Sequence, residues 1–416
     1  MDSSSASNPT LIAVNKAFQA SKKLALAPSQ VRRQSLNLLA NTIEDSFNSI
    51  LEANTLDLEM SREMAVSELT ADWLKLTPER LENTVSIIKQ LGRITDPTKR
   101  LVNAPYQLEF GQTYSQLKPL GTIALIYEAF PELSAIATGM CLKTGNSLIL
   151  RGCTTASHTN QAISQTIKNA LEESALPSSC VEVISPDMGS SIQDLVVQER
   201  NLDLIIPYGR PSLVQQITEQ ATAPVLRTAI GNCYLYWSAS GKSELIKEMI
   251  IDSHKGTPDA VNAIEKVLVY GGIKPSYLTS LFVSLQKKGF ELRGETELVK
   301  DFFEYLKPLK ASEWGRPYMK KTVAFGYVDD LSEAISWINR YSSGHADSIA
   351  TESYQESRQF AGDVDSALIY INTSPRFERN PNCGEAIFLG MSNQKGYRQG
   401  LISLETFTTI KQVVQG

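Results

Sequence analysis

The chain has 416 residues, of which 42% are hydrophobic and 20% are charged, so it is long enough for more than one compact domain with its own core. A total of 40 Lys and Arg against 45 Asp and Glu gives a net charge of −5 without a basic block, which excludes a general nucleic-acid-binding surface. No apolar run approaches the roughly 20 residues of a membrane-spanning helix. The first residues lack the parts of an export signal, so we expect a cytoplasmic protein.

The cysteines and histidines favour neither a disulfide framework nor a metal site. The cysteines are odd in number and include no Cys-x-x-Cys pair, and the three histidines are dispersed. We therefore expect reduced thiols and no metal cofactor. The cysteines are Cys141, Cys153, Cys180, Cys233 and Cys383.

The first hundred residues predict helices followed by a hairpin. Residues 10–91 carry apolar side chains at helical spacing, and Thr77-Pro-Glu-Arg is typical of a helix start. From Tyr106 to Leu120 the apolar residues alternate with polar ones, which predicts a β-hairpin. Hairpins of this kind often pair with a partner chain.

Short apolar strands then alternate with helices, which predicts a parallel sheet covered by helices on both faces, as in nucleotide-binding proteins. A second alternating block follows and is expected to form its own sheet. The segment from residue 366 begins as a strand and ends as a polar tail that returns to the first layer or crosses to another subunit. The expected strands are 123–127, 147–151, 181–184, 204–207, 232–237, 266–270 and 322–327, and the expected helices are 132–144, 158–174, 192–198, 212–220, 242–253 and 277–287.

Several strings, taken together and in order, resemble gamma-glutamyl phosphate reductase, also called glutamate-5-semialdehyde dehydrogenase, of the aldehyde dehydrogenase superfamily. They extend over most of the chain. They are Leu76-Thr-Pro-Glu-Arg-Leu, Pro119-Leu-Gly-Thr-Ile-Ala-Leu-Ile-Tyr-Glu-Ala, Cys141-Leu-Lys-Thr-Gly-Asn-Ser-Leu-Ile-Leu-Arg-Gly, Asp203-Leu-Ile-Ile-Pro, Gly231-Asn-Cys-Tyr, His345-Ala-Asp-Ser-Ile and Tyr370-Ile-Asn-Thr-Ser-Pro-Arg-Phe.

The resemblance implies an α/β fold of the aldehyde dehydrogenase type. Residues 1–103, 118–228 and 355–384 are expected to form a doubly wound nucleotide-binding-type domain, and residues 229–354 a second, catalytic-type α/β domain. Residues 104–117 and 385–416 are expected to form a hairpin-and-tail oligomerisation element. Because members with this element form dimers or tetramers, we expect a homo-oligomer, with room for a further, unidentified protein partner.

The family reduces gamma-glutamyl phosphate with NADPH through a thioester on an active-site cysteine. Its motif Arg-Pro, two residues, Cys-Asn-Ala corresponds to Thr257-Pro-Asp-Ala-Val-Asn-Ala, which places Val261 at the nucleophile position. An isopropyl group has no lone pair with which to attack an acyl phosphate. The resemblance therefore carries over Asn262, an oxyanion-type neighbour, without the nucleophile.

Charged positions that the family uses for an anionic substrate also differ. Phe130 replaces the arginine of the family's Glu-Ala-Arg-Pro, and Tyr208 replaces that of Ile-Pro-Arg-Gly-Gly, although Arg210 lies two residues away. Arg376 is kept and is a candidate for binding a carboxylate or for holding its own loop. We therefore expect Phe130 and Arg376 to mark the substrate position.

The residues at the expected cofactor-binding positions argue both for and against NADP binding. Arg151 occupies the strand-end position at which the superfamily contacts the adenosine ribose or its phosphate, and the turn Tyr208-Gly209-Arg210 precedes a helix whose N–H groups could meet a pyrophosphate. Against binding, Pro317 replaces the glutamate of the family's Trp-x-x-Glu-Tyr, a nicotinamide-ribose ligand. NADP binding is thus possible but doubtful.

Two functions follow from these observations. The first is a pseudoenzyme that lacks the catalytic cysteine and acts by binding a ligand or a partner. The second is an NADP-dependent glutamate-5-semialdehyde dehydrogenase, or a related aldehyde oxidoreductase of proline biosynthesis, with an altered mechanism in which Asn262 polarises the carbonyl or a displaced cysteine attacks it. Cys233, Cys153 and Cys383 are the thiols to test, and His254 is a candidate for proton transfer.

Overall fold

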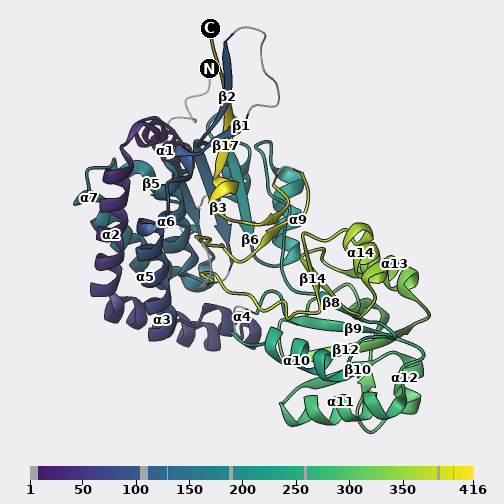
Figure 1. Cartoon of the computed structure of the whole chain (residues 1–416). Helices are drawn as coiled ribbons and strands as arrows, with labels where there is room; N and C mark the ends of the chain where they lie inside the picture. The colour runs from purple at the N-terminus through teal and green to yellow at the C-terminus, as the bar shows by residue number, and fades with distance from the viewer. Residues whose placement is uncertain are drawn as a thin grey trace. The chain divides into compact units, whose positions relative to one another are not determined.

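The computed structural model describes residues 8–103, 111–128, 130–186, 191–256, 260–381, 385–396 and 398–416. The chain divides into two compact units. The first contains residues 1–228, 379–389 and 402–416, and the second contains residues 229–378 and 390–401. Figure 1 labels the helices and strands.

The helices and strands follow the alternation expected from the sequence. The helices are α1 (Pro9–Leu26), α2 (Ser29–Asp45), α3 (Phe47–Glu63), α4 (Glu68–Leu74), α5 (Pro78–Arg93), α6 (Leu133–Thr144), α7 (Ser157–Glu172), α8 (Ile192–Val196), α9 (Pro211–Gln220), α10 (Ser243–Ser253), α11 (Pro275–Lys287), α12 (Thr296–Asp301), α13 (Leu331–Tyr341) and α14 (Tyr354–Asp363). The strands are β1 (Leu101–Asn103), β2 (Gln112–Pro119), β3 (Thr122–Tyr127), β4 (Ser147–Arg151), β5 (Val181–Val183), β6 (Leu204–Tyr208), β7 (Thr228–Ala229), β8 (Cys233–Trp237), β9 (Ile264–Tyr270), β10 (Glu291–Gly294), β11 (Lys307–Pro308), β12 (Thr322–Val328), β13 (Ala346–Ala350), β14 (Leu368–Ile371), β15 (Ser392–Asn393), β16 (Gly400–Leu401) and β17 (Thr408–Gln415).

The first unit is built on a parallel sheet with the order β5-β4-β3-β6. Every residue of β3 and β6 is buried, as expected for central strands covered on both faces. Helix α5 begins where the sequence predicted, because the Thr77 side chain accepts a hydrogen bond from the Arg80 N–H and Pro78 takes the first helical position. The order reverses at β3, since β4 and β5 lie on one side of it and β6 lies on the other.

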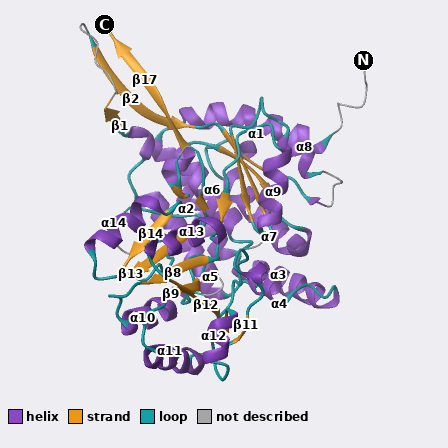
Figure 2. Ribbon diagram, turned by 90° about the vertical axis from the view of Figure 1, so that its right-hand side faces the viewer, coloured by secondary structure: helices purple, strands orange, loops and turns teal. Residues whose placement is uncertain are grey.

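A separate antiparallel sheet in the first unit joins strands from the first third of the chain to its C-terminal segment. Its order is β1-β2-β17, and β17 pairs along the whole of β2, from Thr408 opposite Pro119 to Gln415 opposite Gln112. Figures 1 and 2 show β2 and β17 running side by side beyond the helices of this unit. The tail therefore returns to the hairpin, whereas the expected hairpin residues Tyr106, Leu108 and Phe110 lie outside the described residues.

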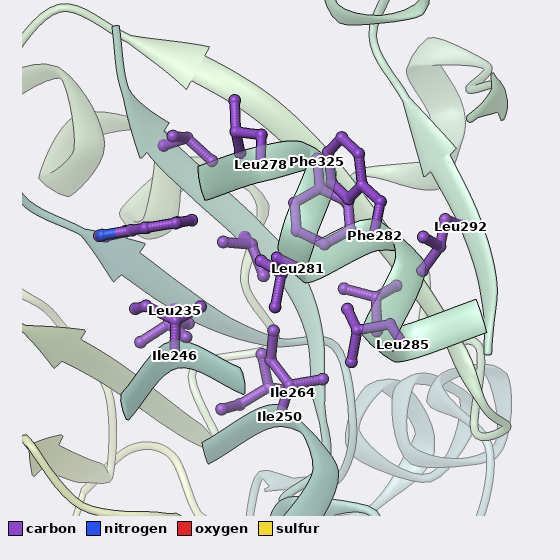
Figure 3. Packing of buried hydrophobic residues seen from close by; sticks show 14 of the residues in the cluster. Leu235, Ile246, Ile250, Ile264, Leu278, Leu281, Phe282, Leu285, Leu292 and Phe325 are labelled. Atoms are coloured by element: carbon purple, nitrogen blue, oxygen red, sulfur yellow. The ribbon is translucent and has the colours of Figure 1, made fainter. Parts of the chain in front are cut away.

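The second unit contains a seven-stranded parallel sheet with the order β11-β10-β12-β9-β8-β13-β14. One face packs on α10 and α11 through a core of aliphatic and aromatic side chains, of which Phe282 and Phe325 meet edge to face with ring centres 4.9 Å apart (Figure 3). The expected boundaries placed residues 355–384 in the first domain. Residues 355–378 instead pack in the second unit, because β14 pairs in parallel with β13.

None of the helices in the described ranges combines the length and the apolar character that crossing a bilayer requires.

Candidate functional site

The predicted nucleophile position lies in a turn that leads into β9 of the second unit. Val261 is fully buried, and its carbonyl oxygen accepts a hydrogen bond from the Gly231 N–H at 2.9 Å. The turn is closed by the Ala263 N–H, which donates to the Ala260 carbonyl oxygen at 3.0 Å. The motif residues 257–259 lie outside the described parts of the chain. The side chain at this position is an isopropyl group, which offers no electron pair to a carbonyl carbon.

Asn262, the second predicted catalytic residue, is held at both ends of its side chain. Its amide nitrogen donates to the Tyr370 hydroxyl at 3.1 Å, and its amide oxygen accepts from Nε2 of His345 at 2.6 Å. Nδ1 of His345 lies against the Ser392 hydroxyl. Burial lowers the pKa of His345 to about 3, so the ring is neutral and carries its proton on Nε2. These bonds fix Asn262 and leave the Tyr370 hydroxyl hydrogen for another acceptor.

The four cysteines that the structure describes are poor nucleophiles in this arrangement. Cys233, at the start of β8, is fully buried with its sulfur 3.8 Å from the Val261 carbonyl oxygen, and burial raises the pKa of its thiol. Burial likewise raises the pKa of the Cys141, Cys180 and Cys153 thiols. Reactive cysteines need the opposite shift, toward the thiolate. Cys383 lies outside the described residues.

His254 and Arg376, also in the second unit, have different surroundings. Nε2 of His254 lies 2.9 Å from the Ile264 carbonyl oxygen, and burial lowers the pKa of the ring to about 4, so it is a neutral donor to the backbone. The Arg376 side chain is 42% exposed, and its guanidinium lies 3.9 Å from an Asp252 oxygen and 3.6 Å from a Glu378 oxygen. Such exposed pairs hold a guanidinium weakly. Carboxylate binding by Arg376 stays a prediction.

The loop that carries Pro317 is held by a buried pair of charges that the sequence analysis did not single out. Glu265 accepts hydrogen bonds from the backbone N–H groups of Tyr318, at 2.8 Å, and Met319. The ammonium of Lys266 lies 3.6 Å from the centre of the Tyr318 ring, and burial lowers its pKa to about 8. A Glu-Lys pair inside an apolar strand is the sequence signal that identifies this anchor.

The first unit has a cavity of about 480 Å³ at the carboxyl ends of its parallel strands. Ligands of doubly wound sheets bind at this edge, where the strand order reverses. Arg151, at the end of β4, lines the cavity and donates from Nη1 to the Gly152 carbonyl oxygen at 2.9 Å. The other lining residues are Val66, Ser67, Thr70, Trp73, Ile126, Tyr127, Glu128, Gly152, Cys153, Thr154, Thr155, Pro186, Ile192, Arg210 and Leu213.

Phe130 and Tyr208 are buried against one another in the first unit. Their ring centres lie 5.9 Å apart edge to face, and Phe130 also stacks on Trp73 at 5.7 Å. Both side chains are fully buried, and neither is among the residues lining the cavity. The structure thus brings together the two positions at which the resemblance implies arginines, but it joins them as packing partners. Their predicted binding roles remain predictions.

The turn after β6 is closed by a carboxylate from the end of β3. One oxygen of Glu128 accepts from the backbone N–H and from Nε of Arg210, both at 3.1 Å, and the other accepts from Nη2 at 3.0 Å. These bonds raise the pKa of Arg210. A Cβ atom placed on Gly209 would lie 2.7 Å from a Glu128 oxygen, so the carboxylate rests directly on the glycine. The sequence analysis missed Glu128, because its partner is 82 positions away.

Comparison with known proteins extends these observations. The family model described as the aldehyde dehydrogenase family matches residues 4–232. Over 385 residues, 92% of each chain, the sequence is 55% identical to gamma-glutamyl phosphate reductase 2 of Synechocystis, and over 405 residues, 97% of this chain and 96% of the relative, it is 36% identical to gamma-glutamyl phosphate reductase of Gloeobacter violaceus. The crystal structure of the Thermotoga maritima gamma-glutamyl phosphate reductase matches with a TM-score of 0.89 at 30% identity, covering 98% of this chain and 99% of that one, which confirms the expected fold class.

Proposed function

This chain belongs to the gamma-glutamyl phosphate reductases of the aldehyde dehydrogenase family, and on that premise we propose that it has lost the thioester reaction and acts by binding a ligand or a partner. The observation that carries the proposal is the fully buried valine at the nucleophile position. Without a thiolate, the covalent route has no first step.

The surroundings of Val261 support the same conclusion. The thiol of Cys233, whose sulfur lies 3.8 Å from the Val261 carbonyl oxygen, has a raised pKa and is fully buried in the second unit. Asn262 donates its amide hydrogen to Tyr370 and accepts from His345, which leaves one amide hydrogen for a developing oxyanion. The polar frame around the former nucleophile is therefore intact, while the reacting atom is missing.

The packing of Phe130 and Tyr208 supports loss of the anionic substrate. Acyl phosphates are recognised by guanidinium and ammonium donors. Here two aromatic rings pack together and fill the volume near Trp73. A ring pair of this kind stabilises the fold by burial and offers no charge to a phosphoryl group.

A nicotinamide cofactor is implied by the family and would supply a hydride when bound. Three residues that line the cavity would hold the ribose or phosphate of the cofactor: Arg151 through its guanidinium, and Thr154 and Thr155 through their hydroxyl groups. The turn after β6 does not fit the pyrophosphate in the arrangement shown, because the Arg210 N–H already donates to Glu128.

A second candidate function, reduction of gamma-glutamyl phosphate to glutamate 5-semialdehyde in proline synthesis, is favoured by the 55% identity to a relative named gamma-glutamyl phosphate reductase 2. For this chain it would require a thiol other than one at position 261, or direct hydride addition to the acyl carbon of gamma-glutamyl phosphate, with inorganic phosphate as the leaving group. Tyr370 is then the hydroxyl best placed beside Asn262 to polarise a carbonyl oxygen.

The two candidates are separated by following NADP reduction with glutamate semialdehyde and phosphate. The unmodified chain is assayed beside Val261→Cys and beside a family member that keeps the motif cysteine. We expect turnover only from that family member, because Val261→Cys restores the sulfur but not the two lost arginines.

Turnover by the unmodified chain contradicts the proposal. In that case Cys233→Ser, Cys153→Ser and Cys383→Ser decide between a displaced thiol and a noncovalent route, since loss of activity in one variant identifies the nucleophile. Activity in all three variants favours direct hydride transfer, which Tyr370→Phe then tests.

We further propose that the chain is a cytoplasmic homo-oligomer whose contact surface includes the β1-β2-β17 sheet. Val102, Ile410 and Val414 are 38%, 45% and 50% exposed there and lie on the same face, because Ser115 of β2 stands opposite Val102, Leu117 opposite Ile410 and Thr113 opposite Val414. Sedimentation of Ile410→Glu beside the unmodified chain tests this surface, and an unchanged oligomer size would contradict it.

A further inference from the structure

Asn262 belongs to a row of five hydrogen-bonded polar side chains in the second unit, the polar row. Its members, in order, are Gln394, Ser392, His345, Asn262 and Tyr370. Nε2 of Gln394 donates to the Ser392 hydroxyl at 2.6 Å, and that hydroxyl lies 2.5 Å from Nδ1 of His345. Nε2 of His345 lies 2.6 Å from the Asn262 amide oxygen, and the amide nitrogen lies 3.1 Å from the Tyr370 hydroxyl.

The inner members of the polar row are shut off from water. Ser392 and His345 have no exposed surface, and Asn262 is 1% exposed. A buried donor or acceptor that lacks a partner destabilises the fold by at least the value of the lost hydrogen bond. Each donor must therefore face an acceptor, so one end of the polar row sets the direction of all of its hydrogen bonds.

Gln394 is the end that sets this direction. Its amide nitrogen can only donate, so the Ser392 oxygen accepts from it and the hydroxyl hydrogen is left for Nδ1 of His345. Because Nδ1 is then an acceptor, the neutral ring carries its proton on Nε2 and donates to the amide oxygen of Asn262. The amide nitrogen of Asn262 consequently faces the Tyr370 oxygen, and the hydroxyl hydrogen of Tyr370 is directed elsewhere.

We propose that Gln394 is a positioning residue that fixes the direction of the polar row. It thereby keeps the Asn262 amide nitrogen and the Tyr370 hydroxyl as a pair of donors for one acceptor, the carbonyl oxygen of an aldehyde or an acyl group. The two donor atoms are 3.1 Å apart, so a single oxygen atom can meet both. The inference rests on the proposed function in one respect, since it concerns the polar frame that remains around Val261.

Two observations agree with a donor pair at this end of the polar row. Burial raises the pKa of the Tyr370 hydroxyl, so it keeps its hydrogen at neutral pH. A polar row of the opposite direction would turn the amide oxygen of Asn262 toward Tyr370, and an oxygen there would repel the carbonyl oxygen of a ligand. The direction of the polar row therefore decides which ligand atom is accepted.

Gln394→Glu tests the inference, because it reverses the direction of the polar row with little change in shape. A carboxylate only accepts, so the Ser392 hydroxyl would donate to it and Nδ1 of His345 would carry the ring proton. The full chain labelled with nitrogen-15 at histidine contains only three imidazole rings, and His345→Gln identifies the signals of this one. At pH 7.5 we expect His345 to be protonated on Nε2 in the unmodified chain and on Nδ1 in Gln394→Glu.

Calorimetric titration with 4-oxobutanoate, an aldehyde without an amino group, measures what the direction does to binding. We expect Gln394→Glu and Tyr370→Phe to bind this aldehyde at least about tenfold more weakly than the unmodified chain, because each removes a donor from the carbonyl oxygen. Gln355→Glu is the matched control, since Gln355 is exposed on α14 of the same unit. It should change neither the affinity nor the protonated nitrogen of His345.

A proton on Nδ1 in the unmodified chain, or on the same nitrogen in the unmodified chain and in Gln394→Glu, would overturn the positioning role. An unmodified chain that does not bind the aldehyde, or that binds it no better than Gln394→Glu, would overturn the class of ligand. Where Gln394→Glu does not fold, Gln394→Met removes the donor at similar length and should leave His345 as a mixture of both neutral forms. The protonated nitrogen is read without turnover, so activity of the unmodified chain contradicts the proposed function and leaves this inference standing.

Discussion

Truncating Phe130 tests whether the positions of the two lost arginines have become part of the core. Phe130→Ala removes a fully buried ring that contacts Trp73 and Tyr208, with ring centres 5.7 and 5.9 Å away. The variant keeps a Cβ at the same backbone angle, a left-handed φ of 55°, so the local backbone strain is unchanged. The loss is therefore that of the ring alone.

The magnitude follows from burial. Phe→Ala substitutions in cores cost about 3 to 5 kcal/mol, and an aromatic pair adds about 0.5 to 1.5 kcal/mol beyond area burial. We expect Phe130→Ala to lower the free energy of unfolding of the first unit by about 4 kcal/mol. The double variant with Tyr208→Ala should show a coupling energy of about 1 kcal/mol, because the two rings touch.

Urea unfolding followed by tryptophan emission suits this site. Of the four tryptophans, Trp73 alone lies in the first unit, and its ring stacks on Phe130. A matched control is Leu26→Ala in the same unit, since Leu26 is 86% exposed and should change the free energy of unfolding by less than about 0.5 kcal/mol. If Phe130→Ala cost no more than this control, the ring would not be core, and the argument that packing has replaced an anion site would fail.

Three further predictions concern the second unit and the thiols. Burial lowers the pKa of His254 in the folded chain from 6.5 to about 4, so unfolding takes up a proton between these pH values and the free energy of unfolding falls as the pH falls. His254→Gln should therefore remove about 2 kcal/mol of the decrease in the free energy of unfolding between pH 7 and pH 5. Urea unfolding curves at each pH measure this difference. Glu265→Ala should cost about 3 to 5 kcal/mol, because it leaves the Lys266 ammonium buried without its partner carboxylate, and a melting temperature equal to that of wild type would contradict this. Site-resolved mass spectrometry after iodoacetamide at pH 7.5 should find Cys233 unmodified in the native chain and Cys153 modified more slowly than free cysteine; fast labelling of either would indicate a thiolate that burial does not suppress.

Much of the fold was predictable because its signals are local. The strand before residue 128 and the helix beginning after Thr77 are short-range patterns of apolar spacing and capping, and the structure has both. The placement of residues 355–378 was wrong, because β14 joins a sheet through pairing with β13, which the order of elements alone does not reveal. The pairing of β17 with β2 was likewise not specified, since it joins strands nearly 300 residues apart in the sequence.

The sequence predicts residues for the candidate site but not the contacts that they make. The motif identified Val261 and Asn262, and burial of both follows from their place before a central strand. The bonds of Asn262 to His345 and Tyr370 join segments 83 and 108 residues away, and they depend on side-chain orientation. Sequence spacing carries no information on such contacts until the sheet is assembled.

Phe130 and Tyr208, the two positions at which the resemblance implies arginines, carry aromatic side chains that pack on one another. Removing an arginine from an interior leaves a void and unpaired partners, each of which destabilises the fold. The rings of Phe130 and Tyr208 pack edge to face against one another, and Arg210 donates three hydrogen bonds to Glu128. Under the proposed function, the aromatic pair is packed and Glu128 is already paired with Arg210, so we expect the first unit to need no bound phosphate for its stability. We therefore expect the free energy of unfolding of the first unit to be independent of NADPH, so addition of the nucleotide should leave the midpoint of unfolding unchanged. A nucleotide that did bind, at a free concentration 100 times its dissociation constant, would instead raise the free energy of unfolding by about 2.7 kcal/mol.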